Sequence, residues 1–108
     1  MKRMTKKEAI KALNRVDTPF VEFFKHGSMQ LEFYQPQNVD LQQPHDRDEL
    51  YFIVSGSGMF IKNNIPQPFE AGEVIFVPAG MQHRFEDFTD DFSTWVVFYG
   101  PTGGEALV

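Results

Sequence analysis

The sequence of 108 residues contains no cysteine, which excludes both disulfide bonds and thiolate metal ligands. A metal bound by this chain is therefore held by histidine, carboxylate or amide groups, which favours metals that do not need thiolate ligands. No run of apolar residues approaches the length of a membrane-spanning helix. No apolar segment follows the basic start, as one would in a secretory signal. We therefore expect a cytoplasmic protein with no membrane partner.

Positive charge is also scarce in this chain. It has 10 Lys and Arg residues against 15 Asp and Glu residues, a net charge of -5. This balance argues against a nucleic-acid partner, which needs a clustered basic surface. The basic residues gather in the first fifteen positions, where they are most simply the solvated face of a helix. Twelve phenylalanines, in contrast, favour strands and a large aromatic interior within a single domain.

One short helix is predicted near the N-terminus. Thr5 and Glu8 have the spacing of a capping box, in which a hydroxyl and a carboxylate bind the free amides at a helix start. An apolar face follows, and Asp17 and Pro19 end the helical potential. We expect a helix over residues 6–14, within an N-terminal helical extension of residues 1–18.

From Pro19 onward the sequence predicts short strands separated by Gly, Pro and Asn turns. The segment Met29–Tyr34 alternates apolar and polar residues, as a half-buried strand does. The expected strands span residues 20–25, 29–34, 49–55, 59–62, 74–77, 82–86 and 93–99. Many short strands joined by turns favour a sandwich or barrel. The expected fold class is all-β, with one domain over residues 19–100 and a flexible tail over residues 101–108.

The strand around Leu50–Val54 is apolar on both faces, so both faces need to be covered. In so small a domain the interior covers one face, and a second subunit is left to cover the other. We therefore expect a homodimer.

Three histidines are available as metal ligands. His26 lies in a polar turn beside Gly27 and is expected to be exposed. His45 precedes a strand that carries Glu49, and His83 begins a later strand. Two imidazoles and one carboxylate are the facial set that binds iron and related divalent metals while leaving coordination positions open.

Two longer patterns surround these residues. The first reads Gln43-x-His45-x3-Glu49-x6-Gly56. The second reads Gly72-x5-Pro78-x-Gly80-x2-His83. Together they resemble the two motifs of the cupin superfamily, where a His-x-His pair precedes the glutamate and an asparagine follows the second histidine. In this chain Gln43 stands where the first histidine is usual, and Asp87 stands where the asparagine is usual.

The resemblance to small single-domain cupins implies a double-stranded β-helix, or jelly-roll barrel, whose metal ligands project inward at one end. It implies one divalent metal ion (Fe, Mn, Ni, Co or Zn) bound by His45, Glu49 and His83. Gln43 would be a fourth, weak ligand or a hydrogen-bond partner of bound water. A site without stable metal stays open as the alternative.

Other residues near the motifs are placed by parity along the strands. Tyr51 shares the parity of Glu49 and Phe85 that of His83, so these two and Trp95 are expected to line the pocket. A plain core position is the alternative for Trp95. Asp46 and Asp48 have the opposite parity and are expected to be surface charges.

The implied function is that of a metal-binding cupin. One reading is a divalent-metal-dependent enzyme of dioxygenase or isomerase type that acts on a small molecule. The alternative is a binding or sensing cupin without turnover, which need not hold a metal. Catalytic residues are not identified, because apart from Tyr51 and Glu86 the sequence offers no proton-transfer group near the motifs.

Overall fold

The structure is a computed structural model that describes residues 3–106. The outermost residues of the predicted extension and tail, 1–2 and 107–108, lie outside the described residues. The described elements are α1 (Lys6–Leu13), β1 (Phe20–His26), β2 (Met29–Tyr34), β3 (Asp48–Ser55), β4 (Ser57–Lys62), β5 (Ile65–Glu70), β6 (Val74–Val77), β7 (His83–Glu86) and β8 (Ser93–Tyr99). The search of this range finds no helix long and apolar enough to cross a membrane.

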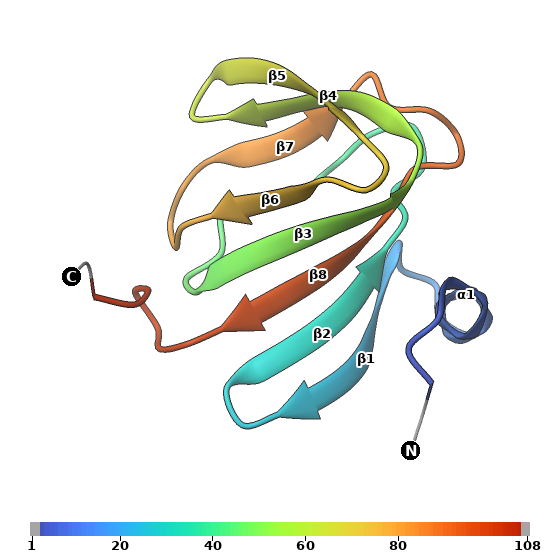
Figure 1. The fold of residues 1–108 in the computed structure, drawn as a ribbon, viewed down its shortest axis with the longest axis horizontal. Coiled ribbons are helices and arrows are strands. Elements are labelled where there is room, and N and C mark those ends of the chain that lie inside the picture. The colour runs from blue at the N-terminus through green and yellow to red at the C-terminus, as the bar shows by residue number, and fades with distance from the viewer. Residues whose placement is uncertain (1–2, 107–108) are drawn as a thin grey trace.

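Two antiparallel sheets make up the fold (Figure 1). The larger sheet has the strand order β1-β2-β8-β3-β6, and the smaller has the order β5-β4-β7. The chain crosses from one sheet to the other between β3 and β4, between β5 and β6, and again on either side of β7. The all-β jelly-roll architecture with a short N-terminal helix is thus confirmed.

Strand β5 is the one strand that the sequence interpretation missed. None of the expected strands includes residues 63–73, where Pro66 and Pro68 each lack the amide donor of a sheet ladder. In the structure β5 is the edge strand of the smaller sheet and pairs only with β4. An edge strand tolerates proline, since one of its sides needs no partner.

Aromatic side chains fill the space between the two sheets. Phe85 of β7 lies at the centre, with its ring centroid 4.7 to 5.1 Å from those of Phe60, Phe69, Tyr51 and Phe92. Tyr51, Phe85 and Phe92 are almost completely buried. Half of the twelve phenylalanines lie in or against this core, which is the aromatic interior that the sequence predicted.

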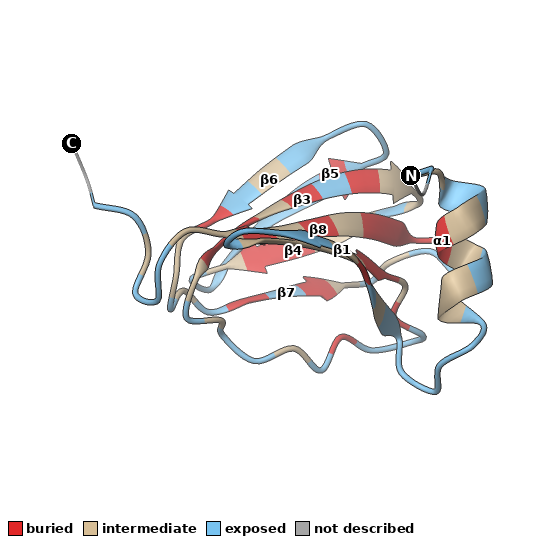
Figure 2. Cartoon of the chain, turned by 90° about the horizontal axis from the view of Figure 1, so that it is seen from below, coloured by how far each residue is buried: buried red, intermediate tan, exposed pale blue. Residues whose placement is uncertain are grey.

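A second apolar cluster lies on the outer face of the larger sheet, under α1. Thr5 caps this helix by accepting a hydrogen bond from the amide of Glu8 at 3.1 Å. Ala9 is fully buried against Phe23 and Phe33, and Figure 2 shows the buried side of α1 turned toward the strands. Trp95 packs into the same cluster, with its ring centroid 5.1 Å from that of Phe33.

The C-terminal segment is hydrogen-bonded to the domain as far as Glu105, although the sequence suggested a flexible tail. The amide of Gly103 donates to the carbonyl oxygen of Asp46 at 2.6 Å. The carboxylate of Asp48 accepts the amide of Glu105 at 2.8 Å and the amide of Ala79 at 2.9 Å. Asp48 is consequently buried rather than a surface charge, because the tail and the turn before β7 cover it.

Candidate metal centre

His45, Glu49 and His83 meet at one end of the space between the sheets. Glu49 lies on β3 of the larger sheet, His83 on β7 of the smaller sheet, and His45 in the segment that precedes β3. One ligand atom from each of the three side chains lies within 4.8 Å of those of the other two. Glu49 and His83 are buried, and His45 is partly exposed. His26, in contrast, is exposed at the end of β1, as expected.

His83 is oriented by a backbone carbonyl. Its Nδ1 lies 2.9 Å from the carbonyl oxygen of Met81, which can only accept, so Nδ1 carries a proton. Its Nε2 faces Glu49 Oε1 at 3.0 Å and Tyr51 Oη at 2.9 Å. Burial lowers the pKa of His83, but the hydrogen bonds to Glu49 and Met81 outweigh burial and raise that pKa. Fixing one ring nitrogen by a carbonyl is how proteins direct the other toward a metal.

The second oxygen of Glu49 has no partner. Glu49 Oε2 is buried and accepts no hydrogen bond from any described residue. A buried charged acceptor without a partner costs more than the roughly 1–3 kcal/mol of a neutral one. A divalent cation held by this carboxylate and the two imidazoles would remove that cost, and the donor set suits iron, manganese, nickel, cobalt or zinc. The residues present therefore fit a metal ion.

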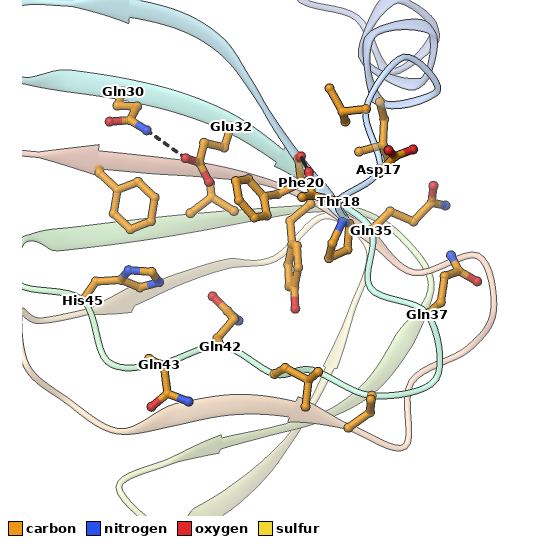
Figure 3. Close-up of a pocket in the computed structure, with 18 of the residues that line it drawn as sticks. Asp17, Thr18, Phe20, Gln30, Glu32, Gln35, Gln37, Gln42, Gln43 and His45 are labelled. Atoms are coloured by element: carbon orange, nitrogen blue, oxygen red, sulfur yellow. Dashed lines mark hydrogen bonds between the residues drawn. The ribbon is translucent and has the colours of Figure 1, made fainter.

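The neighbouring glutamines are placed differently from the sequence expectation. The side chain of Gln43 is exposed in the wall of a cavity, whereas Gln42 Oε1 accepts the hydroxyl proton of Tyr51 at 2.8 Å. In Figure 3 the two side chains extend to opposite sides of the chain. Parity counted back from Glu49 fails here, because β3 begins at Asp48 and residues 35–47 form no strand.

The carboxylate of Asp40 holds this segment in place. It accepts hydrogen bonds from Tyr34 Oη at 2.5 Å and from the amide of Phe85 at 2.8 Å. It also accepts the amide and the side-chain Nε2 of Gln42, at 3.1 and 2.9 Å. A hydrogen-bonded chain therefore runs from Asp40 through Gln42 and Tyr51 to His83. Sequence reasoning missed Asp40 and Gln42, since their partners lie in distant strands and leave no local pattern.

Two tyrosine hydroxyls belong to this network. Burial and then the charge of Glu49 raise the pKa of Tyr51 well above its ordinary value. Burial, followed by the hydrogen bond to Asp40, also raises the pKa of Tyr34. Both hydroxyls therefore keep their protons at neutral pH. Because the hydroxyl group of Tyr51 donates its hydrogen bond to Gln42, a lone pair of Tyr51 Oη faces His83.

A cavity of about 970 Å³ opens beside His45 (Figure 3). Its wall includes Phe20, Glu32, Tyr34, Gln42, Val96 and Phe98. The three aromatic residues expected to line a pocket are not part of this wall. Tyr51 and Phe85 are buried between the sheets, and Trp95 faces α1 because alternation along β8 puts it opposite Val96 and Phe98.

Glu32 is a second ionisable group of this cavity that sequence reasoning did not select. It alternates with Leu31 and Phe33 on β2, and such a pattern suggests a solvated side chain. One face of β2 in fact packs into the cluster under α1, and the other face lines the cavity. Glu32 is half-buried, and burial raises its pKa.

Comparison with known proteins agrees with this architecture. The Cupin domain family matches residues 30–99. The chain is 33% identical over 101 residues to "Uncharacterized protein SCO3923" of Streptomyces coelicolor, covering 92% of this chain and 94% of that protein. It is 44% identical over 68 residues to an acireductone dioxygenase of Sulfurihydrogenibium, covering 58% of this chain but only 38% of the enzyme.

A solved structure supports the same fold. Protein NMB1881 from Neisseria meningitidis superposes with a TM-score of 0.69 at 18% identity, covering 92% of this chain and all of that one. The family match includes Glu49 and His83 together with the strands that carry them. The chain therefore belongs to the cupin family.

Proposed function

We propose that this cupin binds one divalent metal ion through His45, Glu49 and His83 and acts on a small molecule held in the adjacent cavity. The observation that carries the proposal is the buried, unpartnered Glu49 Oε2 beside two histidines. The metal would be iron, manganese, nickel, cobalt or zinc. Gln43 is left outside the ligand set, because its side chain is exposed and turned away from Gln42.

The reaction class that fits best is that of a metal-dependent dioxygenase or isomerase. A bound metal would polarise a substrate oxygen or support redox chemistry. The similarity to an acireductone dioxygenase supports the first class. His45 lies where the cavity meets the metal ligands, so a substrate in the cavity would reach the open side of the site.

The protein supplies orientation and proton control around this site. The carbonyl of Met81 holds the ring of His83, and Gln42 directs the hydroxyl proton of Tyr51 away from the site. Glu32 adds a half-buried carboxyl group to the cavity wall, and burial raises its pKa.

A binding or sensing cupin without metal is the second candidate. The observation that favours it is the direct contact between Glu49 and His83, at 3.0 Å, which lets the two side chains partly satisfy each other without an ion. In that case the cavity would bind its ligand without turnover. Metal analysis separates the two candidates.

The test is elemental analysis of protein purified without chelators, followed by metal titration. We expect about one divalent ion per chain and, for Glu49→Gln, an affinity lower by more than about 100-fold, because even residues that only support ligands contribute 10- to 100-fold. Asp46→Asn is the matched control, since Asp46 is exposed and lies beside His45. Absence of metal binding in the unmodified protein would support the metal-free candidate. Equal binding by Glu49→Gln would place the metal elsewhere.

We also propose that the outer face of β3 and β6 is covered by a second copy of the chain. On this face Leu50 pairs with Phe76 and Phe52 with Val74. Phe52, Phe76 and Val74 are 39%, 43% and 56% exposed. Light scattering should give twice the chain mass of 12.5 kDa.

The variant Phe76→Lys should shift this protein toward the monomer. Ile65→Lys should not, since Ile65 is also exposed but lies on β5 of the smaller sheet. A monomeric unmodified protein would contradict the proposed dimer.

A further inference from the structure

Glu32 places a carboxylate in the wall of the cavity without a cationic partner. Its neighbours across the sheet are Glu22 on β1 and Val96 on β8. Glu32 Oε2 accepts one hydrogen bond, from Gln30 Nε2 at 2.8 Å. Oε1 accepts none from residues 3–106, and no Lys, Arg or His in that range forms an ion pair with this carboxylate. Burial raises the pKa of Glu32, and the hydrogen bond from Gln30 and the more distant charge of Arg47 lower it without offsetting the burial.

The charged residues of the wall do not suit an anionic ligand. Asp17, Glu32 and Asp46 contribute carboxylates, and Arg47 is the cation among the described wall residues. Arg47 is already occupied: it donates to the carbonyl of Ser28 and, at 3.3 Å, to Gln30 Oε1. Its guanidinium also lies 5.9 Å from the ring centroid of Phe98. Away from the proposed metal beside His45, a ligand carboxylate or phosphate would meet three acids and an arginine that is already hydrogen-bonded.

The remaining wall suits an apolar body that carries a positive charge. Phe20, Tyr34 and Phe98 contribute aromatic rings, and Val39, Leu41 and Val96 contribute aliphatic surface. Aromatic faces attract ammonium groups, so rings and a carboxylate together favour an organic cation. Figure 3 shows Glu32 reaching the cavity from β2 and His45 reaching it from the segment before β3. A ligand in the cavity can thus contact both residues through different ends.

We propose that the cavity selects small molecules with a protonated amine and an apolar body, and that Glu32 is the residue that pairs with the amine. We also infer that an oxygen at the other end of such a molecule faces the metal ligands beside His45, and this part rests on the proposed function. The amine preference itself rests on Glu32 and the cavity wall, so it is tested with and without metal.

The test compares 2-phenylethylamine with 2-phenylethanol, which has nearly the same size and shape but no charge at neutral pH. Isothermal titration calorimetry at low salt is done with the protein as purified and repeated after chelator treatment. We expect the amine to bind at least about tenfold more tightly than the alcohol in both forms, as a charge-assisted hydrogen bond in a partly buried site does. In the chelated form, phenylacetate should bind more weakly than the alcohol.

Two glutamine variants assign the preference to a residue. Glu32→Gln keeps the side-chain shape and should bring the amine down to the affinity of the alcohol. Glu22→Gln is the matched control: Glu22 lies opposite Glu32 on β1, is exposed, pairs with Lys25 at 3.7 Å and is not part of the wall. It should keep the full preference, and a cooperative thermal unfolding transition in each variant would show that both are folded.

Three results would overturn the inference: equal binding of amine and alcohol by the unmodified protein, a preference that survives in Glu32→Gln, or no binding of the amine at millimolar concentration. Failure of the proposed function leaves a different signature. A protein that binds no metal but retains the amine preference would refute the metal site alone, whereas a metal-binding protein without the preference would refute this inference alone.

Discussion

The buried carboxylate of Asp40 fastens the segment that carries Gln42 and His45 to the interior of the domain. Asp40 is 7% exposed and accepts four hydrogen bonds, from Tyr34, from the amide of Phe85 and twice from Gln42. Asp40→Ala removes all four acceptor contacts at once, and it leaves the amide of Phe85 and the hydroxyl of Tyr34 inside the domain. The change therefore tests whether this carboxylate organises the segment of residues 35–47.

The expected loss follows from the burial of these donors. A buried donor left without a partner costs about 1–3 kcal/mol. Phe85 and Tyr34 are buried, whereas Gln42 is partly exposed and its two donors can turn to water. Two costly donors and two cheaper ones predict a loss of about 3–5 kcal/mol, a large part of the 5–15 kcal/mol that stabilises a typical domain. Asp40→Asn, which keeps one acceptor oxygen, should lose less.

Urea unfolding monitored by the fluorescence of Trp95 measures this loss. Trp95 lies in the cluster under α1, away from Asp40, so it reports global unfolding rather than a local change. Asp46→Ala is the control, because Asp46 lies in the same segment but is exposed, and it should stay within about 0.5 kcal/mol of the unmodified protein. A loss below about 1 kcal/mol for Asp40→Ala would refute the role given to this carboxylate.

Two further predictions concern the site and the cavity. Tyr51→Phe should weaken metal binding about tenfold, as loss of a supporting contact does. Gln43→Ala and Gln43→His should leave the metal affinity unchanged. Calorimetric titration measures all three variants, and tighter binding by Gln43→His would show that Gln43 belongs to the ligand set. Because burial raises the pKa of Glu32 above its unfolded value, the stability it contributes is complete below the unfolded pKa and is lost as pH rises through the folded pKa. Glu32→Gln should thus raise the thermal midpoint at neutral pH but not near pH 3; equal effects at both pH values would contradict this.

The resemblance to the two cupin motifs predicted His45, Glu49 and His83 as one ligand set, and the structure brings a ligand atom of each within 4.8 Å of the others. Their spacing depends on regular strands and tight turns, which are local features that a sequence pattern records well. Glu49 and His83 both lie in strands whose bounds were predicted to within one residue. The order of the strands within each sheet was not predicted, because it depends on which strands meet after the chain crosses between the sheets.

The residues around the ligands were harder to predict, because the segment that carries them is irregular. Gln43 was expected near the metal because it stands where the cupin motif has its first histidine, but no strand before Asp48 carries the parity of Glu49 back to it. Asp40 binds the amide of Phe85, 45 positions away in the sequence, so no local pattern marks it. Trp95 was expected in the pocket, with a plain core position as the alternative, and the structure shows the alternative. Glu32 was not selected for a related reason: each strand has two faces, and only the packed structure shows that α1 covers one and that the cavity lies on the other.

The contact between Glu49 and His83 joins the larger sheet to the smaller one through side chains. In a chain without cysteine, an ion shared by these residues would act as a reversible counterpart of a disulfide. It would close a loop of about 35 residues, and a cross-link of that span restricts the unfolded chain by about 4 kcal/mol. Loss of the ion would then loosen β4 and β7 more than β2 and β8. Binding of the ion would accordingly slow hydrogen exchange in the backbone amides of the smaller sheet.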